Sequence, residues 1–178
     1  MDVMIKSHLN IVTIFTLIIL LAMSRLVPHP PNFTPIIAMA VLSGAFLNNR
    51  LLSFILPLLA MFISDLFLGF HSGMFVVYFS IAICVFLGFL ISKKPSFINS
   101  VMALSASVFV FYVITNFSVW YNSGLYPQTI EGLISCYILA LPFVQNTLVS
   151  TLIFGLGSFF VYDKLQKYLI FSTKNQNS

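Results

Sequence analysis

The chain has 178 residues, of which 60% are hydrophobic and only 7% are charged. Soluble domains are about 45–50% apolar and about 25% charged, and 8 Lys and Arg with 4 Asp and Glu could not cover the surface of a soluble domain of this size. The composition therefore indicates an integral membrane protein and excludes intrinsic disorder, a disulfide scaffold and a nucleic-acid-binding domain.

Apolar runs separated by proline-rich, charged or glycine-containing segments predict an all-α protein with six transmembrane helices. A helix needs about 20 apolar residues to cross a bilayer. The predicted spans are Leu9–Val27, a short run Ile36–Leu47, Leu51–Phe70, Met74–Ile91, Phe97–Tyr121 and Leu133–Tyr162. The last run would extend about 45 Å as one straight helix, so we expect it to bend or break near Pro142.

The chain is expected to form a single transmembrane domain over residues 1–162, followed by a polar cytoplasmic tail, 163–178, that frays. An alternative for the first run is a signal peptide, because Lys6 precedes it and an Ala-Met-Ser sequence near its end resembles a cleavage site. The length of the run and Arg25 directly after that sequence favour a membrane span.

Basic residues predict the orientation of the six spans. Both termini and the loops at 48–50 and 92–96 would lie on one side of the membrane. That side would hold Lys6, Arg50, Lys93, Lys94, Lys164, Lys167 and Lys174, whereas the other side would hold Arg25 alone. Cytoplasmic loops carry the excess of Lys and Arg. The distribution predicts an N-in, C-in protein of the bacterial plasma (inner) membrane.

This orientation can be tested with a topology reporter. A reporter fused after Ser178 is expected to give a cytoplasmic signal, because an even number of spans returns the chain to the side on which it began. A periplasmic signal would contradict the six-span prediction.

Polar and ionisable side chains concentrate toward the predicted outer half of the spans and in the outer loops. A charge at the centre of a span costs about 2.5–3.5 kcal/mol on insertion scales, so such residues suggest a function. The candidate ligand-binding residues are Arg25, Asn32, Asp65, His71, Tyr112, Asn116, Trp120, Tyr137 and Asn146. Thr34, Thr115 and Thr147 belong to the same polar set but are not among these candidates. The asymmetry predicts a cavity that is open to the outside and closed toward the cytoplasm.

The fifth predicted span carries the clearest pattern. Tyr112, Asn116 and Trp120 recur at i, i+4 and i+8 and so share one helix face. An amide between two rings could bind a flat polar ligand by stacking and hydrogen bonding. Alternatively, Trp120 belongs to the interfacial aromatic belt and Asn116 bonds a neighbouring helix.

Asp65 has three interpretations: a ligand contact, an ion pair with Arg25 at similar depth, or a cap on a neighbouring helix. If the two are paired, Asp65→Asn and Arg25→Gln are each expected to destabilise the protein, and the double mutant to lose less than the sum.

The sequence carries no catalytic or metal-binding motif, because HExxH, Walker A, GxSxG and Cys/His clusters are all absent. We therefore expect no enzymatic activity, no cofactor and no bound metal. Small residues spaced by four predict close helix packing, at Ala40 and Gly44 and again at Ser80, Cys84 and Gly88.

Four stretches carry a family resemblance: SRLVPHPPNFTPIIAMA (24–40), PLLAMFISDLFLGFH (57–71), TNFSVW (115–120) and YPQTIEGLISCYILALPFVQNTL (126–148). They resemble an uncharacterised bacterial family of small six-span membrane proteins, which is in turn similar to the substrate-binding, or S, components of energy-coupling-factor transporters.

An S component binds a water-soluble vitamin or related micronutrient from outside the cell. The resemblance therefore implies a small polar solute as ligand, with a coupling membrane subunit and ATPases as partners in the lipid bilayer. S components often carry an AxxxA docking motif in the first span, whereas Leu9–Val27 contains only Ala22. The alternative function is a membrane scaffold or regulatory subunit without a small ligand.

Overall fold

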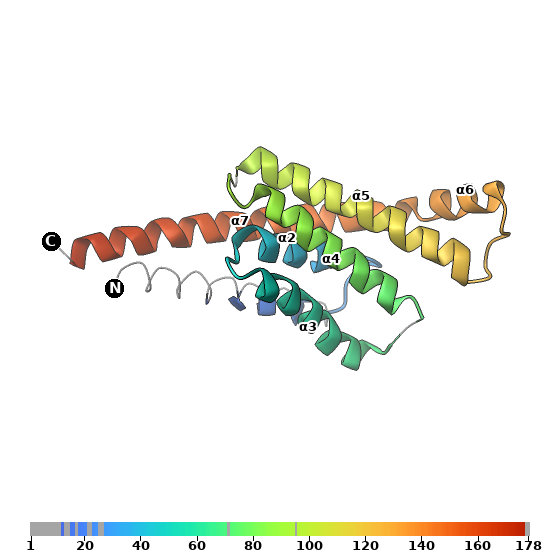
Figure 1. The fold of residues 1–178 in the computed structure, drawn as a ribbon, viewed down its shortest axis with the longest axis horizontal. Coiled ribbons are helices and arrows are strands. Elements are labelled where there is room, and N and C mark those ends of the chain that lie inside the picture. The colour runs from blue at the N-terminus through green and yellow to red at the C-terminus, as the bar shows by residue number, and fades with distance from the viewer. Residues whose placement is uncertain are drawn as a thin grey trace.

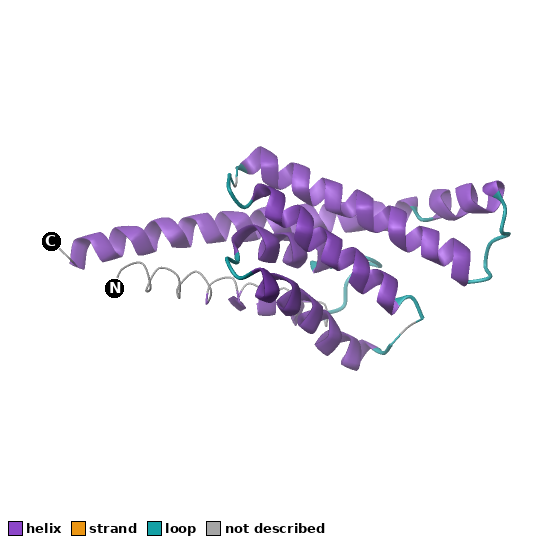
Figure 2. Cartoon of the chain, in the orientation of Figure 1, coloured by secondary structure: helices purple, strands orange, loops and turns teal. Residues whose placement is uncertain are grey.

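The computed structural model describes residues 12, 15–16, 18–20, 23–24, 27–70, 72–94 and 96–176. All regular elements in these ranges are helices (Figures 1 and 2), which confirms the predicted all-α class. The helices with assigned bounds are α2 (Ile36–Phe46), α3 (Arg50–Leu68), α4 (Met74–Ile91), α5 (Phe97–Asn122), α6 (Ile130–Leu139) and α7 (Leu141–Gln176). Most of the first predicted span, Leu9–Val27, lies outside the described residues.

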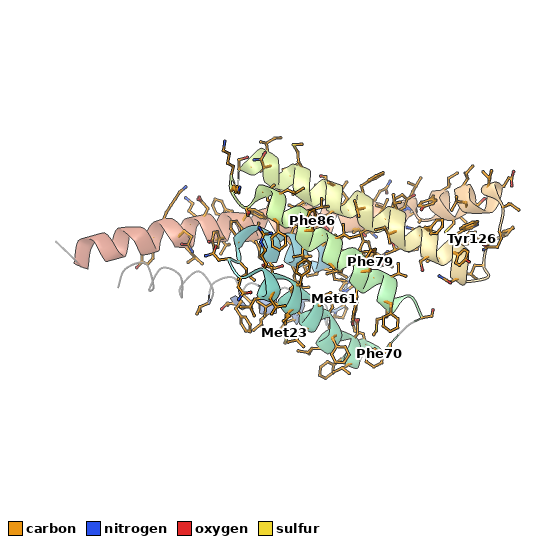
Figure 3. The ribbon with its side chains drawn as sticks, viewed as in Figure 1. Met23, Met61, Phe70, Phe79, Phe86 and Tyr126 are labelled. Carbon is orange, nitrogen blue, oxygen red and sulfur yellow. The ribbon has the colours of Figure 1, made fainter. Side chains whose placement is uncertain are left out.

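Four of the described helices are long and apolar enough to cross a membrane: α3, α4, α5 and α7 over Leu141–Tyr168. Between 28% and 33% of each apolar window is buried inside the bundle, so most of the apolar residues in these windows are exposed or partly exposed. Phe79 and Phe86 on α4 are 62% and 56% exposed (labelled in Figure 3). Such a surface suits contact with lipid, and the chain has the helices of a multi-pass membrane protein.

Helix α2 occupies the centre of the bundle. It packs against α3, α4, α5 and α7, and every residue from Ile37 to Ala45 is buried. A helix that is hydrophobic on all sides is expected to be buried. Its one buried hydroxyl, on Ser43, lies 2.9 Å from the Ala40 carbonyl and 2.8 Å from that of Ser53.

The central helix is also the short one. Eleven residues make α2 about 17 Å long, whereas the 19 residues of α3 extend about 28 Å. Helix α2 therefore fills only part of the depth that its neighbours enclose.

Glycines allow α2 and α4 to approach until their backbones touch. A Cβ placed on Gly44 would collide with the carbonyl of Val85, and one on Gly88 would collide with the carbonyl of Val41. Ala40 and Cys84 are fully buried in the same contact region. The packing predicted from the small-residue spacing is thus confirmed for this helix pair.

The last predicted span differs in detail from the structure. The chain breaks at Ala140 into α6 and α7, close to the break expected at Pro142. Pro142 has no backbone N–H with which to continue the hydrogen-bond ladder of α6, whereas a proline is tolerated in the first turn of a helix, where it stands in α7. The long crossing is therefore α7 from Leu141, while α6 is a separate short helix packed mainly on α5.

The polar tail also differs from the expectation that it frays, because α7 continues as a helix to Gln176. Lys167 Nζ lies 2.7 Å from Asp163 Oδ2, one helical turn earlier. This exposed i, i+4 pair supports the helix modestly, by about 0.3–0.5 kcal/mol.

The bundle has two ends (Figure 1), which differ in the charged residues that lie near them. At one, called the basic end, α3 and α5 begin and α4 finishes, with Arg50, Lys93 and Lys94 close to these termini. At the other, called the loop end, α4 begins, α5 finishes and the chain enters α2. Ring contacts fill the basic end of the core: Phe46 stacks on Tyr162 at 3.9 Å between centroids and lies 4.8 Å from Phe159.

Candidate functional site

A cavity of about 360 Å³ lies at the loop end, beyond the start of α2. Ile36 and Ile37, in the first turn of α2, form part of its wall. Because the longer helices continue past this short one, they enclose space that no core helix fills. The remaining lining comes from the loop before α2 (Asn32, Thr34), from α3 and α4 (Met61, Val77), from α5 (Val108, Phe111, Tyr112, Thr115, Asn116, Val119), and from Ala140 with α7 (Phe143, Val144, Thr147).

A second hollow of about 260 Å³ adjoins the first and shares part of its wall. The shared residues are Asn32, Asn116, Val119, Ala140 and Phe143. Its other lining residues include Tyr126, in the loop between α5 and α6 (labelled in Figure 3), and Cys136 on α6. The two hollows therefore form a recess that reaches from the start of α2 to the α5–α6 connection.

Three polar side chains on the α5 and α7 walls are already bonded to their own helices. Asn116 Nδ2 donates to the Tyr112 carbonyl (2.9 Å), and the Thr115 hydroxyl donates to Phe111 (2.7 Å). The Thr147 hydroxyl donates to the Phe143 carbonyl (2.9 Å). These bonds hold the side chains in place and leave their oxygen lone pairs as acceptors.

The loop that enters α2 is held by a polar row on α7. Asn146 Nδ2 donates to the Pro31 carbonyl (3.0 Å), and Ser150 donates to the carbonyl of Thr34 (3.1 Å). Asn32 adopts φ +59°, a left-handed conformation that Asn tolerates better than most residues. Irregular backbone at membrane depth is tolerated only where it is buried in protein or lines a cavity. The predicted ligand residue Asn146 therefore positions the loop and does not line either hollow.

Two tyrosines fasten α6 to α5 beside the recess. The Tyr112 hydroxyl donates to the Tyr137 carbonyl (2.6 Å), and the Tyr137 hydroxyl donates to the Val113 carbonyl (2.7 Å). Their rings meet edge to face at 5.3 Å, and Cys136 Sγ lies 3.4 Å from the Asn116 carbonyl. Tyr112 lines the larger cavity, whereas Tyr137 serves the contact between helices.

Trp120 occupies a different place from the one predicted. It lines neither hollow, and its indole Nε1 donates to the Pro127 carbonyl (2.9 Å), which secures the α5–α6 loop. Eight residues along an α-helix amount to a rotation of about 80° beyond two full turns. Trp120 is therefore turned away from the face that carries Tyr112.

The loop secured by Trp120 leads into α6, whose first turn is capped by Thr129. The hydroxyl of Thr129 accepts a hydrogen bond from the Gly132 N–H at 3.2 Å. The backbone N–H of Glu131 and the Thr129 hydroxyl lower the pKa of the Glu131 carboxyl below its ordinary value. This carboxylate therefore stays ionised at the N-terminus of the helix, which favours negative charge.

Asp65 is 3% exposed and accepts a hydrogen bond from the Tyr78 hydroxyl at 2.8 Å, which links α3 to α4. It lines neither hollow. Arg25 and His71 lie outside the described residues, so their roles and the Arg25–Asp65 ion pair remain predictions.

A family model described as "Family of unknown function (DUF6580)" matches residues 5–172. The chain belongs to the DUF6580 family. No curated protein and no solved structure matches it. The match agrees with the resemblance to a family of small membrane proteins that has no assigned function.

In this DUF6580 protein, Asn32, Tyr112 and Asn116 are the predicted ligand residues that the fold brings together at the recess. The candidate list missed Thr34, Thr115 and Thr147, although Thr115 follows Tyr112 by three residues and thus lies near its face. A threonine that bonds its own helix gives a weak sequence signal, because the same bond occurs in helices without any site. The aromatic wall residues Phe111 and Phe143 were missed since 20 phenylalanines occur in the chain.

Proposed function

We propose that this protein is the solute-binding component of an uptake transporter for a vitamin-like micronutrient. The observation that carries the proposal is the cavity at the loop end, whose volume of about 360 Å³ lies within the range of about 300–1,000 Å³ common for ligand pockets. Polar side chains from the entry loop, α5 and α7 converge in it on a largely apolar wall. A few converging polar groups on an apolar surface are typical of small-molecule sites.

The proposed topology places this recess on the outer side of the bacterial plasma membrane. The six proposed crossings are the Leu9–Val27 run, the short α2, and α3, α4, α5 and α7. Arg50, Lys93 and Lys94 belong to the basic end, and α7 carries Lys164 and Lys167 beyond the bundle in the same direction (Figure 1). The positive-inside rule then favours a cytoplasmic basic end. The recess would face the supply of solute, as uptake requires.

Energy would come from partner proteins, because the sequence contains no Walker A loop. A coupling membrane subunit and a pair of ATPases would complete the transporter, as in systems that use S components. Since the first span has no AxxxA motif, the coupling subunit would have to recognise a different helix surface.

A membrane scaffold or regulatory subunit is the second candidate, and one observation favours it. Asn146, Ser150 and Tyr137 direct their hydrogen bonds to backbone carbonyls of neighbouring segments. Much of the polar set thus holds helices and loops together, which a protein without a ligand would also need.

Small molecules retained during purification distinguish the two candidates. Native mass spectrometry of the protein released from lipid nanodiscs is expected to detect one solute at about one copy per chain. Val144→Phe should abolish retention, because Val144 lines the cavity and the larger ring would occupy it. The matched control is Val149→Phe on the same helix, where the side chain is 50% exposed and lies outside both hollows.

Thermal unfolding should first confirm that both variants are folded. A solute that is retained by wild type and Val149→Phe but lost from Val144→Phe supports the transport proposal. If both variants retain the solute equally, the cavity is not its site and the scaffold function is favoured.

A further inference from the structure

We infer that the ligand of this recess is an uncharged molecule with a flat apolar body and an edge that carries both a carbonyl-type acceptor and N–H donors, as in a carboxamide or a lactam. This inference rests on the proposed function and adds the chemical class of the solute.

The first argument concerns charge. Among the described residues, none that lines either hollow carries a charged side chain. Asp65 is bonded to Tyr78 away from the lining, and Arg50, Lys93 and Lys94 belong to the basic end. An ion moved into an apolar site without a partner loses its hydration and gains little in return. A neutral ligand avoids this cost.

The second argument concerns the acceptors on the α5 and α7 walls. The hydroxyls of Thr115 and Thr147 already donate to backbone carbonyls, so they present lone pairs. Within the described part of the chain, Asn116 Oδ1 accepts no hydrogen bond, while its Nδ2 is bonded to Tyr112. A carboxylate or phosphate brings only acceptors and would leave these groups unpaired. Ligand N–H groups would satisfy them.

The third argument concerns donors at the start of α2. The first backbone N–H groups of a helix have no partner inside it, and the N-cap residue of α2, Pro35, makes no side-chain cap hydrogen bond. Ile36 and Ile37, which supply these N–H groups, line the cavity. A ligand carbonyl directed at this terminus would complement the donors. The Thr34 hydroxyl makes no hydrogen bond with another described residue, and it can donate or accept.

The fourth argument concerns the apolar wall. Phe111 and Phe143 line the cavity from α5 and α7. Neither ring takes part in a ring–ring contact with another described residue, unlike Phe46 or Phe117. Rings without aromatic partners can stack against a flat ligand. An aromatic or heteroaromatic compound that carries an amide would fit both the apolar walls and the donor and acceptor groups beside them.

A matched probe series on one pyridine ring tests the inference. The probes are nicotinamide, nicotinate, N,N-dimethylnicotinamide and 3-(aminomethyl)pyridine. Their affinities are measured by ligand-observed NMR with the protein in nanodiscs. The formal charge of any co-purified solute is determined as well. Nicotinamide is expected to bind at least about tenfold more tightly than the other three. Thr34→Val should weaken the affinity for nicotinamide several-fold. Val144→Phe should abolish nicotinamide binding, whereas Val149→Phe should not.

The outcomes separate the inference from the proposed function. Suppose that nicotinate or 3-(aminomethyl)pyridine binds at least as tightly as nicotinamide, and that this binding is lost in Val144→Phe. The inference is then overturned, but the transport proposal stands. A charged co-purified solute does the same. If a neutral amide-bearing solute co-purifies, the inference holds even where the pyridine probes bind weakly. If neither a probe nor a retained solute depends on Val144, both proposals fall.

Discussion

Replacing Gly44 by alanine is expected to destabilise the protein strongly, because the added methyl group has no room between α2 and α4. A Cβ at this position would collide with the Val85 carbonyl and approach the Cα of Gly88. These atoms belong to the backbone, so no side-chain rotation relieves the collision and α2 has to move away from α4. Overpacking of a core typically costs about 1–3 kcal/mol and occasionally more. That loss outweighs the gain of about 0.5–1 kcal/mol that alanine brings over glycine in a helix.

The thermal unfolding midpoint in a mild detergent measures this effect. Gly157→Ala is the matched control, because a Cβ there meets no atom within 4 Å. It should leave the midpoint unchanged or raise it slightly. Movement of α2 would also alter the cavity wall at Ile36 and Ile37, so Gly44→Ala should lose any retained solute. Equal midpoints for the two variants would show that the close contact of α2 and α4 is wrong.

Asn116→Ala is expected to weaken binding of the co-purified solute by about 1–3 kcal/mol, or roughly 5- to 150-fold in Kd. Asn116 lines both hollows, and alanine removes the Oδ1 acceptor that a ligand donor would meet. The cost is that of leaving a buried polar group of the ligand without a partner. Isothermal titration with the purified solute, in the same nanodiscs for each variant, gives the affinities.

Asn99→Ala provides the control on the same helix. Asn99 is partly exposed near the start of α5, and its Nδ2 also donates to a backbone carbonyl, that of Lys94 at 2.9 Å. It lies at the opposite end from the recess, so its loss should leave Kd within about twofold. If the affinity for the solute falls equally in Asn116→Ala and Asn99→Ala, or falls in neither variant, the ligand binds elsewhere. Trp120→Phe should change Kd little, because its indole secures the α5–α6 loop and does not line the recess.

The local sequence determined which segments became helices. Met74–Ile91 was predicted with the bounds that α4 has, and Phe97–Tyr121 differs from α5 by one residue. Apolar runs specify helices directly, because the membrane requires each segment to satisfy its own backbone hydrogen bonds. Pro142 marked the break in the last run for the same reason, since proline removes one of those bonds. The shortness of α2 was also visible in the sequence.

Only the tertiary structure decided what the short helix does. Because α2 lies at the centre of the bundle, its limited length creates the cavity; the same helix at the periphery would have faced lipid. The sequence also did not determine the hydrogen-bond partners of the polar side chains. Asn116 and Asn146 are similar amides in apolar helices, yet Asn146 meets the Pro31 carbonyl while Asn116 borders the recess. The difference depends on which loop passes each side chain, and residues more than 100 positions apart set that contact. Sequence periodicity describes a single helix and carries no information about such a partner.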